Sequence, residues 1–154
     1  MRTLELLVGQ RAVHMLDAER TVHDAAGLMT DRQVSSVPVF EGERLVGIVT
    51  ERDLVQRVLA QGLDPVATSL AQVMSRNLVF ASADDSYETA LGRMKRAGVR
   101  HLLVVSGSRL VGVISMRDLL VLEAVEKDEE IRLLTAYIYD IPVALPPVEP
   151  LEPS

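Results

Sequence analysis

Two stretches of this chain repeat each other at a fixed spacing of 65 residues, and this duplication limits the folds open to it. Residues 34–54 match residues 99–119 at ten of 21 positions. In the first copy the identical positions are Val34, Val39, Gly42, Arg44, Leu45, Val46, Gly47, Arg52, Asp53 and Leu54. A weaker match upstream pairs Ala25, Gly27 and Met29 with Ala90, Gly92 and Met94. One unit of this size leaves apolar surface uncovered, so the two copies should pack against each other.

Each copy shows the same order of expected elements. A short extended piece comes first, at residues 13–16 in one copy and 78–81 in the other. A helix follows. Thr21 fits an N-cap with Asp24 at the third helical position, and the second copy's helix should start near Asp85 or Ser86.

A hairpin and a further helix complete each copy. The expected strands are residues 37–40 and 45–49 around Gly42, and residues 102–105 and 110–114 around Gly107. In the first copy the last helix should run from Glu51 to about Gln61, before a stop signal at Gly62. The chain is therefore predicted to have an α/β (α+β) fold, in which two β-α-β-β-α repeats form a pseudo-two-fold pair.

The repeats predict three regions: a first domain at residues 1–65, a second at 66–122 and an extension at 123–154. The linker holds Pro65 and a Thr68/Ser69 cap before a short turn at 70–74. Residues 119–139 fit one long helix or two short ones. Residues 141–154 carry five of the seven prolines, which favours polyproline II or disorder, while their apolar start could instead dock on a partner subunit.

Composition excludes several functions. A net charge of −6 argues against binding to nucleic acid or to an anionic membrane. No targeting segment or membrane-spanning run is expected, and the absence of cysteine fits a soluble protein of the reducing cytoplasm. The three histidines lack metal-ligand spacing, and no recognisable catalytic set occurs, so we expect neither a metal site nor an enzyme.

A polar signature stands twice where a strand should meet a helix. It has the form Gly, two apolar residues, Thr or Ser, two variable residues, Asp, and it ends in Thr50 and Asp53 in one copy and in Ser115 and Asp118 in the other. These pairs could simply be helix caps. The same geometry also offers free N–H groups and a hydroxyl to a phosphate, and a carboxylate to ribose hydroxyls. The residue types alone leave both interpretations open.

This doubled signature within a β-α-β-β-α repeat closely resembles the cystathionine β-synthase (CBS) domain family, over nearly the whole chain up to about Leu120. The resemblance implies a regulatory domain pair that binds a ligand such as AMP, ADP or ATP, with Asp on ribose and Thr or Ser near phosphate. It implies no required cofactor. It also implies a homodimer, and a protein partner that the sequence does not name.

The copies differ just before their hairpins, where the second has Arg100 and His101 and the first has Ser35 and Ser36. In the family, basic residues here often meet phosphates of a nucleotide whose ribose the other copy holds. The resemblance thus assigns Arg100 and His101 to a cleft around Thr50 and Asp53, the better phosphate binder of two. It leaves Ser35 and Ser36 to the cleft around Ser115 and Asp118. Alternatively, Arg100 and His101 only rim the surface.

Two functions from different classes follow. One is an adenine-nucleotide or adenosyl-ligand sensor that signals to a partner, and the other is a ligand-free homodimerisation scaffold. A phosphate on His101 would raise the pKa of its imidazole. Leu103 stands where the first copy has Pro38, so the two hairpin backbones could differ there.

Overall fold

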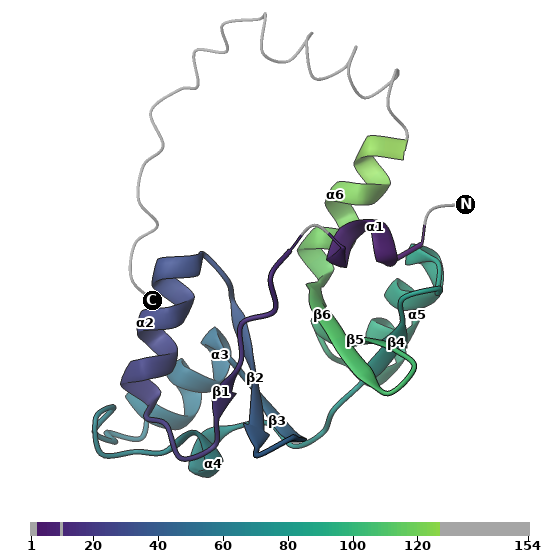
Figure 1. Ribbon diagram of the computed structural model, residues 1–154. Coiled ribbons are helices and arrows are strands. Elements are labelled where there is room, and N and C mark those ends of the chain that lie inside the picture. Colours follow the sequence, from purple (N-terminus) through teal and green to yellow (C-terminus); the bar gives the residue numbers. More distant parts are fainter. Residues whose placement is uncertain (1–2, 10, 127–154) are drawn as a thin grey trace, which may run out of the picture. The chain divides into compact units, whose positions relative to one another are not determined.

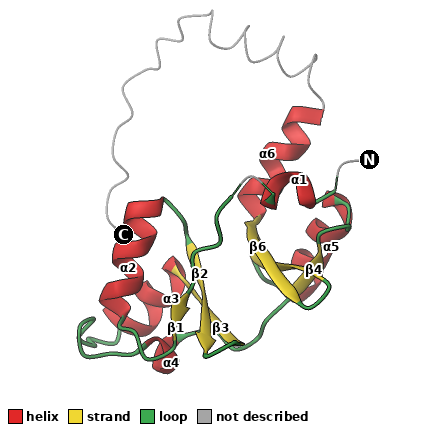
Figure 2. Ribbon diagram, in the orientation of Figure 1, coloured by secondary structure: helices red, strands yellow, loops and turns green. Residues whose placement is uncertain are grey.

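The computed structural model describes residues 3–9 and 11–126, which form two three-stranded sheets with their helices (Figures 1 and 2). The elements are α1 (Glu5–Val8), β1 (Leu16–Asp17), α2 (Val22–Arg32), β2 (Ser36–Glu41), β3 (Arg44–Thr50), α3 (Glu51–Asp53), the π-helix η1 (Leu54–Leu59), α4 (Leu70–Val73), β4 (Phe80–Ser82), α5 (Tyr87–Ala97), β5 (His101–Ser106), β6 (Arg109–Ser115) and α6 (Met116–Glu126). Both sheets belong to one compact unit that ends at Leu119. The chain from Leu120 is a separate unit, which is described only as far as Glu126.

The two sheets have the same topology, which confirms the predicted fold class. Their strand orders are β1-β2-β3 and β4-β5-β6, and in each the first pair is parallel and the second antiparallel. Helix α5 begins 65 residues after α2, at Tyr87 against Val22. Each hairpin also carries one irregularity, between Val39 and Phe40 and between Val104 and Val105. The duplication in sequence is therefore a duplication in structure.

The exchange of Pro38 for Leu103 leaves the hairpins alike, contrary to the difference that the sequence allowed. Pro38 pairs with Ile48 just as Leu103 pairs with Val113. The difference between Pro38 and Leu103 instead changes the pairing with the neighbouring parallel strand. The amide of Leu103 donates to the carbonyl of Val79 at 3.0 Å, a bond that proline cannot make. Accordingly β1 has two residues where β4 has three, and both begin later than predicted.

Local capping starts the long helices where the sequence predicted. The amide of Asp24 donates to Oγ1 of Thr21 at 3.1 Å, and the amide of Thr21 donates to the Asp24 carboxylate at 3.1 Å. Arg20 donates to that carboxylate at 3.0 Å, and these bonds lower the pKa of Asp24 to about 2. Ser86 caps α5 through its hydroxyl, which accepts from the amide of Thr89 at 3.2 Å.

Helix α1 was not predicted, and it belongs to the core of the second repeat. Leu4 and Val8 are buried there, and the amides of Leu4 and Glu5 donate to carbonyls of Asp85 and Ala83 at 3.0 Å. Val8 packs so closely on β6 that a Cβ at Gly112 would lie 2.6 Å from its Cγ1. Only glycine leaves room for this approach.

Helix α4 does the same for the first repeat, in place of the short turn expected at 70–74. Its Leu70 and Val73 lie in the first core, and a Cβ at Gly47 would lie 2.5 Å from Sδ of Met74. Helix α4 begins 65 residues after α1, at Leu70 against Glu5. Helices α1 and α4 are the leading helices, because they come first in their own repeats. Each of them packs on the sheet of the other repeat, so neither repeat closes its core alone.

The helix expected from Glu51 to about Gln61 is shorter and wider than predicted. One α-helical turn, α3, leads into η1, which ends at Leu59 and has bonds such as that from the amide of Ala60 to the carbonyl of Val55, at 2.9 Å. Gly62 then takes a left-handed conformation, with φ of 67°. Of the predicted extension at 123–154, only the residues up to Glu126 lie inside the described range, in α6.

Candidate functional site

Both copies of the polar signature are helix caps. At the β3–α3 junction the amide of Thr50 donates to the Asp53 carboxylate at 2.9 Å, and the amide of Asp53 donates to Oγ1 of Thr50 at 3.2 Å. At the β6–α6 junction the matching bonds between Ser115 and Asp118 are 2.8 and 3.1 Å. The capping interpretation is thus observed in both repeats. Capping leaves a ligand-binding role for these four residues open, because it does not use every carboxylate lone pair.

The residues before each hairpin lie against the junction of their own repeat. The amide of Glu51, at the start of α3, donates to the carbonyl of Ser35 at 3.0 Å. The amide of Met116, at the start of α6, donates to the carbonyl of Arg100 at 2.8 Å. In strand register, Ser36 faces Thr50 and His101 faces Ser115. The two sheets therefore gather the eight predicted site residues at these two junctions, four at each.

One hydrogen bond joins the two groups. Oγ of Ser35 lies 2.9 Å from Nε2 of His101, so the residue before β2 contacts the first residue of β5. Burial lowers the pKa of His101 below its usual 6.5, while the charges of Asp118, Glu51 and Asp53 oppose this shift and that of Arg100 adds to it. Carboxylates from both junctions thus act on one imidazole, and His101 lies between the two.

His101 should make the stability of the fold fall in mild acid. Its folded-state pKa is below 6.5, so the unfolded chain takes up a proton at a higher pH than the folded one. This contribution to the unfolding free energy is complete above 6.5 and is lost as the pH falls towards the folded pKa. We expect urea unfolding to show a smaller drop between about pH 7.5 and 5.5 in His101→Gln than in the parent. An equal drop in both proteins would contradict this.

The two signature carboxylates have different partners. Asp53 accepts from Oγ of Ser75 at 3.1 and 3.3 Å and lies 3.7 Å from Nε of Arg57, which also donates to the carbonyls of Val73 and Met74. Asp118 instead pairs with Nη1 of Arg11 at 3.0 Å. Its side chain is 21% exposed, against 10% for Asp53. The first carboxylate is thus held by Arg57 of its own repeat and by Ser75, which follows α4, and the second is held by Arg11, which follows α1.

Ser75, Arg57 and Arg11 were missed at the sequence level. Ser75 follows α4 closely, Arg57 lies in η1, and Arg11 stands between α1 and β1. The sequence does contain a signal for Arg11: the 65-residue shift aligns it with Arg76, which extends the duplication upstream of Ala25.

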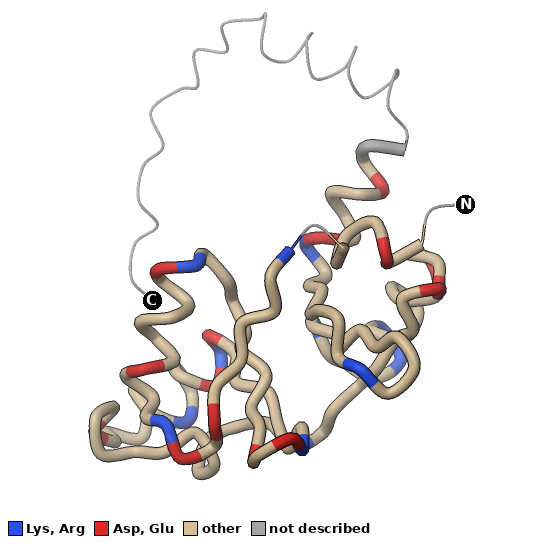
Figure 3. Tube along the Cα trace, viewed as in Figure 1, with Lys and Arg blue, Asp and Glu red and all other residues tan. Residues whose placement is uncertain are grey.

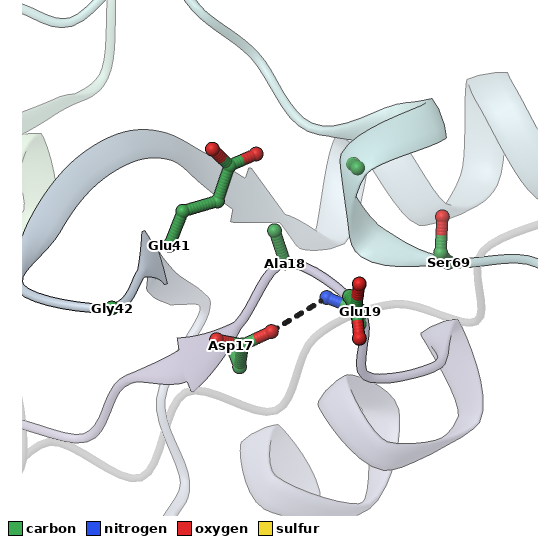
Figure 4. A pocket seen from close by; sticks show the side chains of 7 residues that line it. Asp17, Ala18, Glu19, Glu41, Gly42 and Ser69 are labelled. Atoms are coloured by element: carbon green, nitrogen blue, oxygen red, sulfur yellow. Dashed lines mark hydrogen bonds between the residues drawn. The ribbon is translucent and has the colours of Figure 1, made fainter.

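A depression of about 630 Å³ lies elsewhere in the first repeat (Figure 4). Its lining consists of Asp17, Ala18, Glu19, Glu41, Gly42, Ser69 and Ala71, none of them a predicted site residue. Three of these carry carboxylates, and the Asp17 carboxylate accepts from the amide of Glu19 at 2.9 Å. A lining with three carboxylates disfavours a phosphate, so the depression does not suit a nucleotide.

The charge distribution, the possible metal ligands and the lengths of the helices are further features of the described residues. Acidic and basic residues are interspersed along the described trace (Figure 3). Over residues 3–9 and 11–126, no group of three or more His, Cys, Asp or Glu side chains could hold a metal ion. Within the same range, no helix is long and apolar enough to cross a membrane.

Two matched repeats, each with a Thr/Ser–Asp cap where the hairpin meets its helix, define a class of paired α/β domains. The CBS domain family model matches residues 8–60 and again residues 70–124. The chain belongs to the CBS domain family and contains a pair of these domains. Such pairs are typically regulatory or signal-transduction modules rather than catalytic ones.

Known proteins agree with this assignment. The CBS domain-containing protein YhcV of Bacillus subtilis is 36% identical over 109 residues, which cover 71% of this chain and 77% of YhcV. A CBS-domain protein of Burkholderia ambifaria has a TM-score of 0.75 and 26% identity over 83% of this chain and 96% of its own. The CBS domain pair of protein MJ0100, solved with 5′-methylthioadenosine and S-adenosyl-L-methionine, has a TM-score of 0.72 over 82% of this chain and 98% of its own. At 20% identity, that likeness shows the fold alone.

Other relatives are much longer. The chain spans only 18% and 17% of CBSCBSPB2 and CBSCBSPB3 of Arabidopsis thaliana, to which it is 36% and 35% identical. CBS pairs thus occur inside larger proteins as well as in short chains.

Proposed function

We propose that this chain is a sensor, which binds an adenine nucleotide or adenosyl ligand between its two CBS repeats and transmits occupancy to a partner protein. The observation that carries the proposal is the 2.9 Å hydrogen bond between Ser35 and His101. This bond brings His101, the residue after Arg100, into contact with Ser35. The carbonyl of Ser35 accepts from the amide of Glu51 at the capped β3–α3 junction of the other repeat. A nucleotide needs a cation for phosphate and a carboxylate for ribose, and the proposal assigns the first role to Arg100 and the second to Asp53 or Asp118.

Each residue has a role in this proposal. Arg100 is exposed and carries a full charge, so it can turn towards a phosphate. The hydroxyls of Thr50 and Ser115 can add a hydrogen bond beside it, and the carboxylates of Asp53 and Asp118 can accept from ribose. The MJ0100 pair, with its two adenosyl compounds, supports the ligand class by fold.

Which of the two sites binds phosphate more strongly stays a prediction. It makes the site at Thr50 and Asp53 the stronger phosphate binder, because Arg100 and His101 serve it, and it leaves Ser35 and Ser36 to the second site. A phosphate on His101 would raise the pKa of the imidazole from its lowered value.

A ligand-free scaffold that forms homodimers is the second candidate. Two observations favour it: the signature pairs already bond to their own helix ends, and the first repeat exposes apolar side chains on η1, with Leu59 77% exposed. Apolar side chains together on one helix mark protein interfaces more often than isolated ones do. In that case the protein partner would be a second copy of the chain.

Calorimetric titration separates the two candidates. AMP, ADP, ATP, NADH and S-adenosylmethionine are titrated into the parent protein, into Arg100→Ala and into Arg109→Ala, an exposed arginine at the far end of the second hairpin. A sensor binds at least one ligand saturably. Because a charge-assisted hydrogen bond contributes about 1.5–3 kcal/mol, Arg100→Ala should bind a phosphorylated ligand at least tenfold more weakly.

Arg109→Ala should bind like the parent, since its position lies away from both junctions. Silence across the whole panel would remove the sensor proposal. A dimer by light scattering that no ligand alters would then favour the scaffold.

A further inference from the structure

The carboxylate at the β6–α6 junction already has a cationic partner from a segment distant in sequence. Nη1 of Arg11 lies 3.0 Å from Oδ2 of Asp118, the same oxygen that accepts from the amide of Ser115. Arg11 stands between α1 and β1. Its side chain is 51% exposed, so it can turn away without opening the core. Any ribose that approaches Asp118 must compete with this guanidinium.

At the first junction the carboxylate of Asp53 has other partners, the hydroxyl of Ser75 and an arginine of its own repeat. There the nearby arginine is Arg57, which lies four residues after Asp53 and is anchored on the carbonyls of Val73 and Met74 at 3.0 Å. The 65-residue shift aligns Arg57 with Leu122, so the second repeat lacks this internal cation. The shift also aligns Arg11 with Arg76, whose Nη2 donates to the carbonyl of Ala71 at 3.4 Å. The carboxylates of Asp53 and Asp118 therefore have different cationic partners, Arg57 and Arg11.

We propose that Arg11 makes the β6–α6 site selective for adenine nucleotides that carry phosphate, over adenosine and S-adenosyl compounds. The inference rests on the proposed function and concerns its ligand class. A neutral ribose cannot replace a charged guanidinium on Asp118 at equal strength. A phosphorylated ligand offers Arg11 a new acceptor with the bidentate geometry that guanidinium prefers, and so frees Asp118 for the ribose hydroxyls. A sulfonium ligand brings a further positive charge instead.

The test compares AMP with adenosine and S-adenosylmethionine by calorimetric titration of the full chain. The affinities compared are those of the β6–α6 site, which two-site fits identify as the site that Asp118→Ala removes. The variants are Arg11→Ala, Arg11→Lys and the repeat-matched control Arg76→Ala. The parent should bind AMP at least tenfold more tightly than adenosine. In Arg11→Ala, AMP should weaken about tenfold, while adenosine binds as before or more tightly because its competitor is gone. Arg11→Lys should retain part of the selectivity, and Arg76→Ala all of it.

Two outcomes would overturn the inference and leave the sensor proposal intact. In one, Arg11→Ala binds AMP with the parent's affinity and selectivity. In the other, AMP and adenosine weaken equally, which would make Arg11 a structural partner of Asp118 only. A parent protein that binds none of the compounds would overturn the sensor proposal and this inference together.

Discussion

Replacing Leu4 with alanine is expected to lower the free energy of unfolding by about 3 kcal/mol, as large-to-small changes in a packed core do. Leu4 has no exposed surface and lies in the core of the second repeat. The amide of the same residue donates to the carbonyl of Asp85, so the backbone holds α1 in place and limits collapse around the cavity. Urea denaturation followed by circular dichroism measures the change.

The matched control lies on the same helix. Leu6 is 57% exposed, and its replacement by alanine should change stability by less than about 1 kcal/mol. If the two variants were equally stable, α1 would not be part of the second core in solution. A large effect confined to Leu4→Ala would show that α1 stabilises the core of the second repeat.

Replacing Asp53 with alanine should have the second largest effect, a loss of about 2–3 kcal/mol. The change removes the cap of α3 and takes from Ser75 the acceptor of its hydroxyl. It also leaves Arg57 with its two backbone carbonyls alone. Thermal or urea unfolding of the variant, without ligand, measures this loss.

Asp118→Ala is the natural comparison, because Asp118 occupies the same place in the second repeat. It should cost only about 1 kcal/mol, the usual effect of losing a cap, since its ion pair with Arg11 is half exposed. Equal losses in the two variants would show that Ser75 and Arg57 add nothing. Because Asp53→Ala is expected to lose more stability than Asp118→Ala, a loss of ligand binding in Asp53→Ala must be separated from a loss of folding.

The elements predicted best were those with a strong local pattern. Helix α2 begins after Thr21 as its capping box required, and the hairpin strands lie within a residue or two of the expected ranges. The short parallel strands were displaced by about two residues, because their length depends on a neighbour. Pro38 shows this: its missing amide shortens β1 but leaves its own hairpin unchanged.

The candidate site was predicted in part. The doubled signature predicted Thr50, Asp53, Ser115 and Asp118. The difference in sequence between the two copies at the start of their hairpins predicted Ser35, Ser36, Arg100 and His101. The structure gathers these eight at the two junctions, and their roles towards a ligand stay predictions. It adds partners that no local pattern indicates, since Ser75 and Arg11 come from segments outside the signature.

By itself the sequence determined that this protein is a duplicated CBS pair, where its long helices start and which residues flank each junction. Periodicity and capping motifs are patterns of neighbouring residues, and the repetition is visible when the chain is compared with itself, so all three can be recognised from the sequence alone. Only the tertiary structure decided that the leading helices cross over to complete the opposite core. It alone also decided which cation faces each signature carboxylate. The physical reason is that burial and ion pairing depend on distances in space, and Arg11 comes within 3.0 Å of Asp118 only when both repeats are folded together.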